Sequence, residues 1–83
     1  MQDKTPLNAK GQAHGLWERY YSNGNLFYKG EYINGKRHGY WESYYYNGNL
    51  CYKGSYLNGN QIGFWICGYS EDLSRLTTKF YAK

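Results

Sequence analysis

The feature that most constrains this chain is an internal repeat with a period of 24 residues. Residues 15–38 and 39–62 align without a gap, and most of their aromatic, glycine and asparagine positions agree. Trp17 recurs as Trp41, and Asn-Gly-Asn-Leu at 23–26 recurs at 47–50. A fixed period of this length is typical of repeat proteins, in which each unit packs only against its neighbours.

The ends of the chain continue the repeat in a weaker form. A third unit begins at Gly63, and residues 10–15 echo residues 34–39. In this alignment Phe80 takes the place of Tyr32. We predict one domain over residues 1–83, with these parts: an N-terminal arm and partial repeat (1–14), two full repeats (15–38 and 39–62) and a degenerate C-terminal repeat (63–83). Terminal repeats usually differ because they must end the stack.

Asn-Gly between alternating apolar segments predicts a β-hairpin. With Asn23-Gly24 as a two-residue turn, the facing pairs are Tyr21–Leu26, Tyr20–Phe27, Glu18–Lys29 and Trp17–Gly30. The second repeat gives Tyr45–Leu50, Tyr44–Cys51, Glu42–Lys53 and Trp41–Gly54. This register pairs opposite charges and places each indole over a glycine that leaves it room. Longer, bulged connections are expected after Asn34-Gly35 and Asn58-Gly59.

These hairpins predict an all-β fold, a single antiparallel meander or solenoid of about six strands. Residues 1–7 form a loose arm or a short edge strand. Alternation along each strand defines a packing face that recurs almost unchanged. Its predicted structural core is Trp17, Tyr21, Leu26, Tyr28, Gly30, Tyr32, Trp41, Tyr45, Leu50, Tyr52, Gly54, Tyr56, Trp65 and Tyr69.

The composition bears on the location of the protein but does not identify a ligand. The formal net charge of +4 permits attraction to nucleic acid, anionic lipid or an acidic protein, and selects none of them. No apolar run is long enough for a membrane span and no signal-peptide pattern is present, so we expect a cytoplasmic protein. Cys51 and Cys67 are expected on opposite faces of the sheet, as reduced thiols.

The residues that could carry chemistry are few. Glu18 and Glu42 each face a predicted lysine partner, which favours cross-strand ion pairs over catalysis. His14 and His38 recur at one position but lack a third metal ligand. The glycines recur at turn spacing and form no phosphate-binding loop. We therefore expect no enzyme, no cofactor and no metal site.

At this point the residues resemble a known family. The pattern G-x-W-x-x-Y-Y-x-N-G-x-L-x-x-K-G-x-Y-x-N-G-K-x-x-G resembles the MORN repeat (membrane occupation and recognition nexus), and especially its longer bacterial variant, found among YwqK-family antitoxins. The resemblance covers residues 15–62 fully, and 10–15 and 63–80 in part. It implies an elongated sheet of hairpins with stacked aromatics on one face. It also implies protein binding, dimerisation or lipid binding, and an antitoxin or immunity role for bacterial relatives.

The face opposite the predicted core is aromatic and basic, and a single-layer sheet cannot bury it within one chain. The candidate partner-binding residues are Tyr20, Phe27, Lys29, Tyr40, Tyr44, Tyr46, Lys53, Arg75 and Lys79. Tyrosine with lysine or arginine suits protein interfaces. We expect a non-catalytic protein-binding module: a small inhibitor, antitoxin or phage-type anti-defence protein. The alternatives are nucleic-acid binding, anionic-lipid binding and self-association into a homodimer.

Overall fold

The structure is a computed structural model that describes residues 3–69 and 72–81, with side chains left out of the description at 69 and 72–75. The chain is all-β over the described residues. The strands are β1 (Gly15–Tyr20), β2 (Leu26–Ile33), β3 (Lys36–Tyr44), β4 (Leu50–Leu57), β5 (Asn60–Tyr69) and β6 (Asp72–Tyr81).

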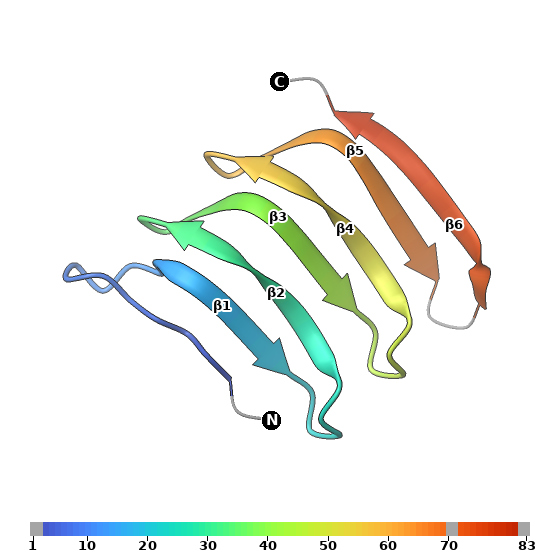
Figure 1. Cartoon of the computed structure of the whole chain (residues 1–83), viewed down its shortest axis with the longest axis horizontal. Helices are drawn as coiled ribbons and strands as arrows, with labels where there is room; N and C mark the ends of the chain where they lie inside the picture. Colours follow the sequence, from blue (N-terminus) through green and yellow to red (C-terminus); the bar gives the residue numbers. More distant parts are fainter. Residues whose placement is uncertain (1–2, 70–71, 82–83) are drawn as a thin grey trace.

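The strands form one open antiparallel sheet in sequence order, β1 to β6 (Figure 1). The Cα trace measures 43 × 36 × 11 Å, so the protein is a single layer. The predicted meander of six strands is confirmed. Wider loops join β1 to β2 and β3 to β4 at one end of the strands (Figure 1). Tight turns join β2 to β3 and β4 to β5 at the other end, which we call the tight-turn edge.

The two kinds of turn are reversed relative to the prediction. Asn34-Gly35 is the tight turn, with φ of 48° and 84° and with Ile33 facing Lys36. Positive φ at both central residues is the geometry that Asn-Gly favours in two-residue hairpins. The connection between repeats is therefore short.

The loop inside each repeat is wider. Gly24 N donates to Tyr21 O at 2.9 Å, and Tyr21 N donates to Asn25 O at 2.8 Å. Gly24 has a φ of 90°, but Asn23 does not have a positive φ. Among the described residues, the non-glycine residues with positive φ are Asn34 and Asn58, in the tight turns. The Asn23 side chain accepts the Asn25 amide at 3.0 Å, a local turn that competes with the expected two-residue turn.

This wider loop changes the register near the turn. Trp17 faces Gly30 and Glu18 faces Lys29, as predicted, but Tyr20 faces Leu26 across a bulge that leaves Phe27 unpaired. The predicted pairs Tyr21–Leu26 and Tyr20–Phe27 are therefore wrong. The same holds one repeat later, where Tyr44 faces Leu50 and the predicted pairs Tyr45–Leu50 and Tyr44–Cys51 are not formed.

The core of the sheet is a row of tryptophans that pack between repeats. Trp41 is 0% and Trp65 2% exposed, and they are the fully buried large side chains among the described residues. A Cβ atom at Gly30 would overlap the ring of Trp41, and one at Gly54 would overlap the ring of Trp65. Each glycine thus makes room for the indole of the following repeat. Removing an indole buried in this way typically costs about 3–5 kcal/mol.

Aromatic rings extend this core across the sheet. Ring centroids 5.0 to 6.2 Å apart join, in order, Trp17, Tyr32, Trp41, Tyr56, Trp65 and Tyr81 in edge-to-face contacts. We call the side that carries this row the tryptophan face. Edge-to-face contacts stabilise by roughly 0.5–1.5 kcal/mol each beyond the area they bury. The repeat units are therefore joined by their rings as well as by the backbone.

The end of the row corrects one prediction. Gly63 faces Tyr81, as Gly15 faces Tyr32, so Tyr81 and not Phe80 takes the position of Tyr32. Phe80 instead faces Phe64 on the other side of the sheet. The register is irregular between Cys67 and Tyr69, and β6 is displaced by one residue from the repeat alignment. A displacement of one residue moves each side chain to the opposite face.

Of the other predicted core residues, Gly30 and Gly54 are buried. The following are only half-buried: Trp17, Tyr21, Leu26, Tyr28, Tyr32, Tyr45, Leu50, Tyr52 and Tyr56. The side chain of Tyr69 lies outside the described residues. A single layer leaves both faces in contact with solvent, which limits complete burial to the centre. Cys51 and Cys67 are free thiols and half-buried.

The segment before β1 lies along the edge of the sheet (Figure 1). Lys4 and Glu18 exchange backbone hydrogen bonds of 2.8 and 2.9 Å. Asp3 accepts the Tyr20 amide at 2.8 Å and forms an ion pair of 2.9 Å with Arg19. The segment is therefore ordered along β1 and not a loose arm, but it forms isolated β-bridges and no regular strand, so the predicted short edge strand is not formed either. It covers part of the edge of β1.

Candidate functional site: two faces of one sheet

The face opposite the tryptophans carries a row of alternating charges. Lys4 neighbours Glu18 across a β-bridge, and the cross-strand register continues through Lys29 and Glu42 to Lys53. We call this row the charge row and its side of the sheet the charged face. Each charge has opposite charges as its nearest neighbours in the row, and such cross-strand pairs stabilise a sheet by roughly 0.2–1 kcal/mol each. The Lys29–Glu18 pair closes to 3.8 Å.

A tyrosine accompanies each glutamate of the charge row. Tyr20 donates its hydroxyl to Glu18 at 2.8 Å, and Tyr44 donates to Glu42 at 2.9 Å. Burial first, and then the hydrogen bond and negative charge of Glu42, raise the pKa of Tyr44 to about 12. The hydrogen bond to Glu18 is the main cause that raises the pKa of Tyr20. These tyrosines are held as neutral donors with fixed rings.

Beside the charge row lies exposed apolar surface. Leu16 is 49%, Tyr40 54%, Phe64 74% and Phe80 64% exposed. The rings of Phe64 and Phe80 contact each other at 4.8 Å between centroids. Leu16 and Tyr40 stand two positions from Glu18 and Glu42. Phe64 stands two positions from Ile66, which faces Lys53, and Phe80 faces Phe64, so all four lie on the charged face. Exposed apolar surface of this kind marks interaction sites in soluble proteins.

The structure brings five of the nine predicted partner-binding residues together. These five lie on the charged face: Tyr20, Lys29, Tyr40, Tyr44 and Lys53. Lys79 faces Trp65 and so lies on the tryptophan face, because of the shift in β6. The side chain of Arg75 lies outside the described residues.

Phe27 and Tyr46 form a separate cluster near the wider loops. Their rings lie 4.6 and 5.3 Å from that of Tyr21, which was predicted to occupy the other face. The bulge at Phe27 breaks the alternation on which that prediction rested. Tyr21 also donates its hydroxyl to the backbone oxygen of Tyr44 at 2.7 Å, so this cluster ties one repeat to the next.

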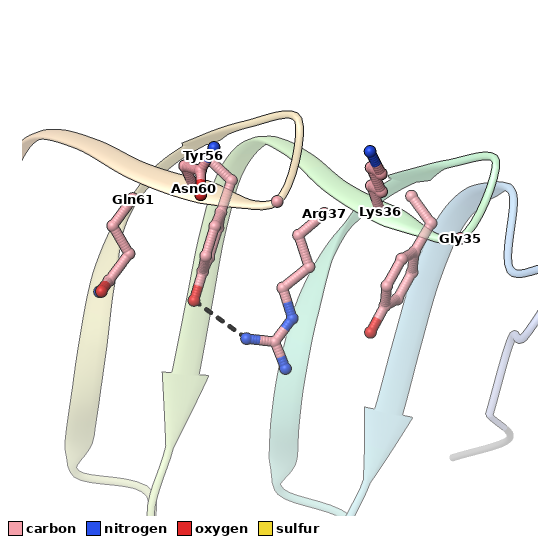
Figure 2. A pocket seen from close by; sticks show the side chains of 8 residues that line it. Gly35, Lys36, Arg37, Tyr56, Asn60 and Gln61 are labelled. Carbon is pink, nitrogen blue, oxygen red and sulfur yellow. Dashed lines mark hydrogen bonds between the residues drawn. The ribbon is translucent and has the colours of Figure 1, made fainter. Parts of the chain in front are cut away.

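The tryptophan face contains a groove that the sequence reasoning missed. Its volume is about 610 Å³, and Figure 2 shows its side chains at the tight-turn edge. Arg37 lies in it, with its guanidinium carbon 5.0 Å from the Trp41 ring and 5.3 Å from the Tyr56 ring. The guanidinium donates to the Tyr56 hydroxyl at 2.9 Å. Arg37 is half-buried.

The electrostatics of Arg37 follow from these contacts. Burial lowers its pKa, but hydrogen bonds with the Tyr32 and Tyr56 phenols outweigh that effect and raise the pKa above the ordinary value. The guanidinium therefore stays charged at all physiological pH values. The sequence feature that could have placed Arg37 correctly is the tight turn, because a two-residue turn at 34–35 puts Arg37 opposite Tyr32 on the tryptophan face.

The histidine positions have a structural role in at least one repeat. His14 Nδ1 accepts a hydrogen bond of 3.1 Å from the backbone N of Asn34, at the tight turn of the next strand pair. The described residues contain no cluster of three or more side chains that could ligate a metal ion. No helix capable of crossing a bilayer occurs in the part of the chain that the structure describes.

Comparison with known proteins agrees with this geometry. The model of a family described as MORN repeat variant matches twice, over residues 13–34 and 37–58. Neither a curated protein nor a solved structure matches the chain. MORN repeats are in general protein-binding or lipid-binding modules. The two matches cover more than half of the sequence, and the chain belongs to the MORN repeat variant family.

Proposed function

We propose that this chain is a non-catalytic module that binds a protein partner through its charged face. The observation that carries the proposal is the exposed aromatic and apolar surface beside the charge row. Tyr40 and Phe64 are more than half exposed, and Tyr44 is oriented by Glu42. Tyrosines held in this way offer large contact area at little cost in conformational entropy. Within residues 3–69 and 72–81 the sheet is a single layer, and no second layer covers these side chains.

The charge row favours a protein over a polyanion. Nucleic acid and anionic membranes attract surfaces on which positive charges gather. On the charged face, Glu18 and Glu42 stand between the lysines, so a polyanion would meet repulsion at every second position. A protein can present charges of both signs in register with the row, which gives specificity and correct docking. Nucleic-acid and lipid binding remain the competing outcomes of the test.

Within the protein-binding class, we propose a small inhibitor that occupies a functional surface of its partner. The support is the resemblance of the repeats to the variant found among YwqK-family antitoxins, together with the scarcity of groups suited to catalysis noted in the sequence. An antitoxin or a phage-type anti-defence protein would act in this way in the cytoplasm. Blocking requires only a stable complementary surface and no cofactor.

The test is a pull-down from bacterial lysate with the tagged full-length chain, with and without nuclease. Tyr40→Ala and Tyr46→Ala are a matched pair, since their exposures are 54% and 55% but only Tyr40 lies on the charged face. We expect Tyr40→Ala and Tyr44→Ala to lose a stoichiometric protein partner that Tyr46→Ala retains. Circular dichroism confirms that each variant is folded.

Three results would contradict the proposal. Equal retention of the partner by the folded Tyr40 and Tyr46 variants would place binding elsewhere. Recovery that disappears after nuclease treatment, with a steep inverse dependence on salt, would indicate nucleic-acid binding. Sedimentation with vesicles that contain phosphatidylserine, but not with phosphatidylcholine alone, would indicate a lipid surface.

A further inference from the structure

The tryptophan face carries a second site, independent of the function proposed above. We propose that the groove around Arg37 binds a carboxylate side chain of an acidic peptide segment. The groove opens at the tight-turn edge, with Lys36 at its rim and Gln61 on its far side (Figure 2). A bound peptide would thus contact the Arg37 guanidinium, the Gln61 amide and the aromatic rings between them.

The position of Arg37 is fixed before any ligand arrives. The guanidinium lies against the rings of Trp41 and Tyr56 at 5.0 and 5.3 Å and donates from Nη1 to the Tyr56 hydroxyl. It is also hydrogen-bonded to the Tyr32 phenol. Trp41 is itself completely buried, so packing holds this support in place. Stacking on aromatic rings is a favourable arrangement for arginine and leaves its in-plane donors available.

The charge of Arg37 has no acidic partner among the residues that the structure describes. The ion pairs in that part of the chain are Arg19–Asp3 and Lys29–Glu18, and neither involves the groove. Around the groove the polar groups are phenols, amides and a second cation, Lys36, with no carboxylate among the described lining residues. A half-buried guanidinium satisfied only by neutral oxygens retains donors that suit an incoming anion.

The repeat supports a ligand role over a purely structural one. Position 37 corresponds to Ala13 in the preceding unit and to Gln61 in the following one. Gln61 faces Tyr56 just as Arg37 faces Tyr32, so the fold accepts an uncharged side chain at this place. A cation is therefore not required to build the sheet, and its presence in the central repeat calls for another explanation.

A carboxylate fits the donors better than a phosphate does. The hydrogen bonds to Tyr56 and Tyr32 use part of the planar guanidinium, and its other N–H groups are available for parallel hydrogen bonds to a carboxylate. A phosphate dianion or a nucleic-acid strand usually requires several cations, and the groove holds only Arg37 and Lys36 among the described lining residues. A second cavity of about 250 Å³ adjoins Arg37, lined also by Tyr52 and Trp65, and can accept the apolar part of the peptide.

The experiment is a titration of the ¹⁵N-labelled full-length chain with a short polyglutamate peptide, followed through the Arg37 Nε–H signal. Arg37→Gln copies the side chain that already occupies the equivalent position 61, so it is expected to fold. Lys53→Gln removes the same charge from the opposite face and serves as the control. Inorganic phosphate, a polylysine peptide and phosphatidylserine vesicles are titrated in parallel.

We expect the Arg37 signal to shift and saturate with polyglutamate, with binding at least about tenfold weaker in Arg37→Gln and unchanged in Lys53→Gln. An unshifted Arg37 signal at millimolar peptide would overturn the proposal. So would equal weakening in the two variants, which indicates diffuse charge attraction, or saturation by phosphate or vesicles without saturation by the peptide. Because the pull-down variants change the charged face, failure of either proposal leaves the other intact.

Discussion

The indole of Trp41 lies over Gly30 of the preceding repeat and not over Gly54, its own cross-strand partner. Trp65 has the same relation to Gly54. The indole Nε1 of Trp41 also donates to the backbone oxygen of Glu31 at 3.1 Å, so the ring and its N–H both contact the strand pair of the preceding repeat. The hydrophobic core of this protein is therefore an interface between repeats, as expected when each unit is too small to bury a face alone.

Gly30→Ala should destabilise the protein by about 3 kcal/mol. The added methyl group would overlap the Trp41 ring, and overpacking of a well-filled core costs about 1–3 kcal/mol or more. Urea unfolding followed by circular dichroism measures the loss. The control is a pair of double-mutant cycles: Gly30→Ala should couple more strongly to Trp41→Phe, whose ring it would overlap, than to Trp17→Phe, its cross-strand neighbour. Equal coupling to both tryptophans would show that the contact lies within the hairpin instead.

Lys29→Glu should destabilise the sheet by about 1 kcal/mol at low ionic strength, and by less at high salt. Lys29 faces Glu18 on one side and Glu42 on the other, so the substitution places three negative charges in adjacent strands. Salt screens only part of this repulsion, because residue 29 is half-exposed whereas Glu18 is buried. Lys36→Glu is the control, because Lys36 is exposed and faces Ile33. An effect that is the same at both salt concentrations would mean that the charge row does not contribute through electrostatics.

Tyr21→Phe should cost about 1 kcal/mol of unfolding free energy, since its hydroxyl donates to the Tyr44 backbone oxygen at 2.7 Å and an unmade bond leaves that acceptor poorly satisfied. Tyr45→Phe should do the same, because Tyr45 donates to the Gly68 backbone oxygen at 3.2 Å. Tyr46→Phe is the control, as Tyr46 is mostly exposed. Equal stability of all three variants would show that these hydroxyls bond equally well to water.

The repeat period and the hairpin pattern were enough to predict the sheet, the number of strands and the pairs Trp17–Gly30 and Glu18–Lys29. Turn geometry was not predictable in the same way, because Asn-Gly occurs in both loops of the repeat. At 34–35 both residues adopt positive φ, whereas at 23–24 the Asn23 side chain forms a local hydrogen bond and the loop widens. The choice between these two turn geometries depends on local hydrogen bonds, which cannot be read from the residue pattern.

The errors about the candidate sites follow from those turns. The bulge in the wider loop moved Phe27 to the side of Tyr21, and a shift of one residue in β6 moved Lys79 to the tryptophan face. The central part of the charged face was predicted correctly, because Tyr20 and Tyr44 lie before the bulges. Arg37 was missed because a charged residue beside a turn looks like ordinary surface in the sequence.

The phenol of Tyr44 gives a prediction about alkaline pH. Burial, followed by the hydrogen bond to Glu42, raises its pKa from 10.0 to about 12, so the folded state favours the neutral form. A group whose pKa is higher in the folded state loses its stabilising contribution as pH rises through the unfolded and then the folded value. The contribution of Tyr44 to stability should therefore be complete below pH 10 and decline between pH 10 and 12.

Carbon NMR of the tyrosine Cζ atoms measures this titration directly, with Tyr44→Phe to assign the signal. In Glu42→Gln the pKa of Tyr44 should fall toward the ordinary value but stay above it, because burial is the largest cause and remains. The wild type should also lose more unfolding free energy than Tyr44→Phe over this pH range, since other tyrosines titrate alike in both. A Tyr44 signal that titrates at the ordinary value would show that the ring is solvated and that Glu42 does not hold it on the charged face.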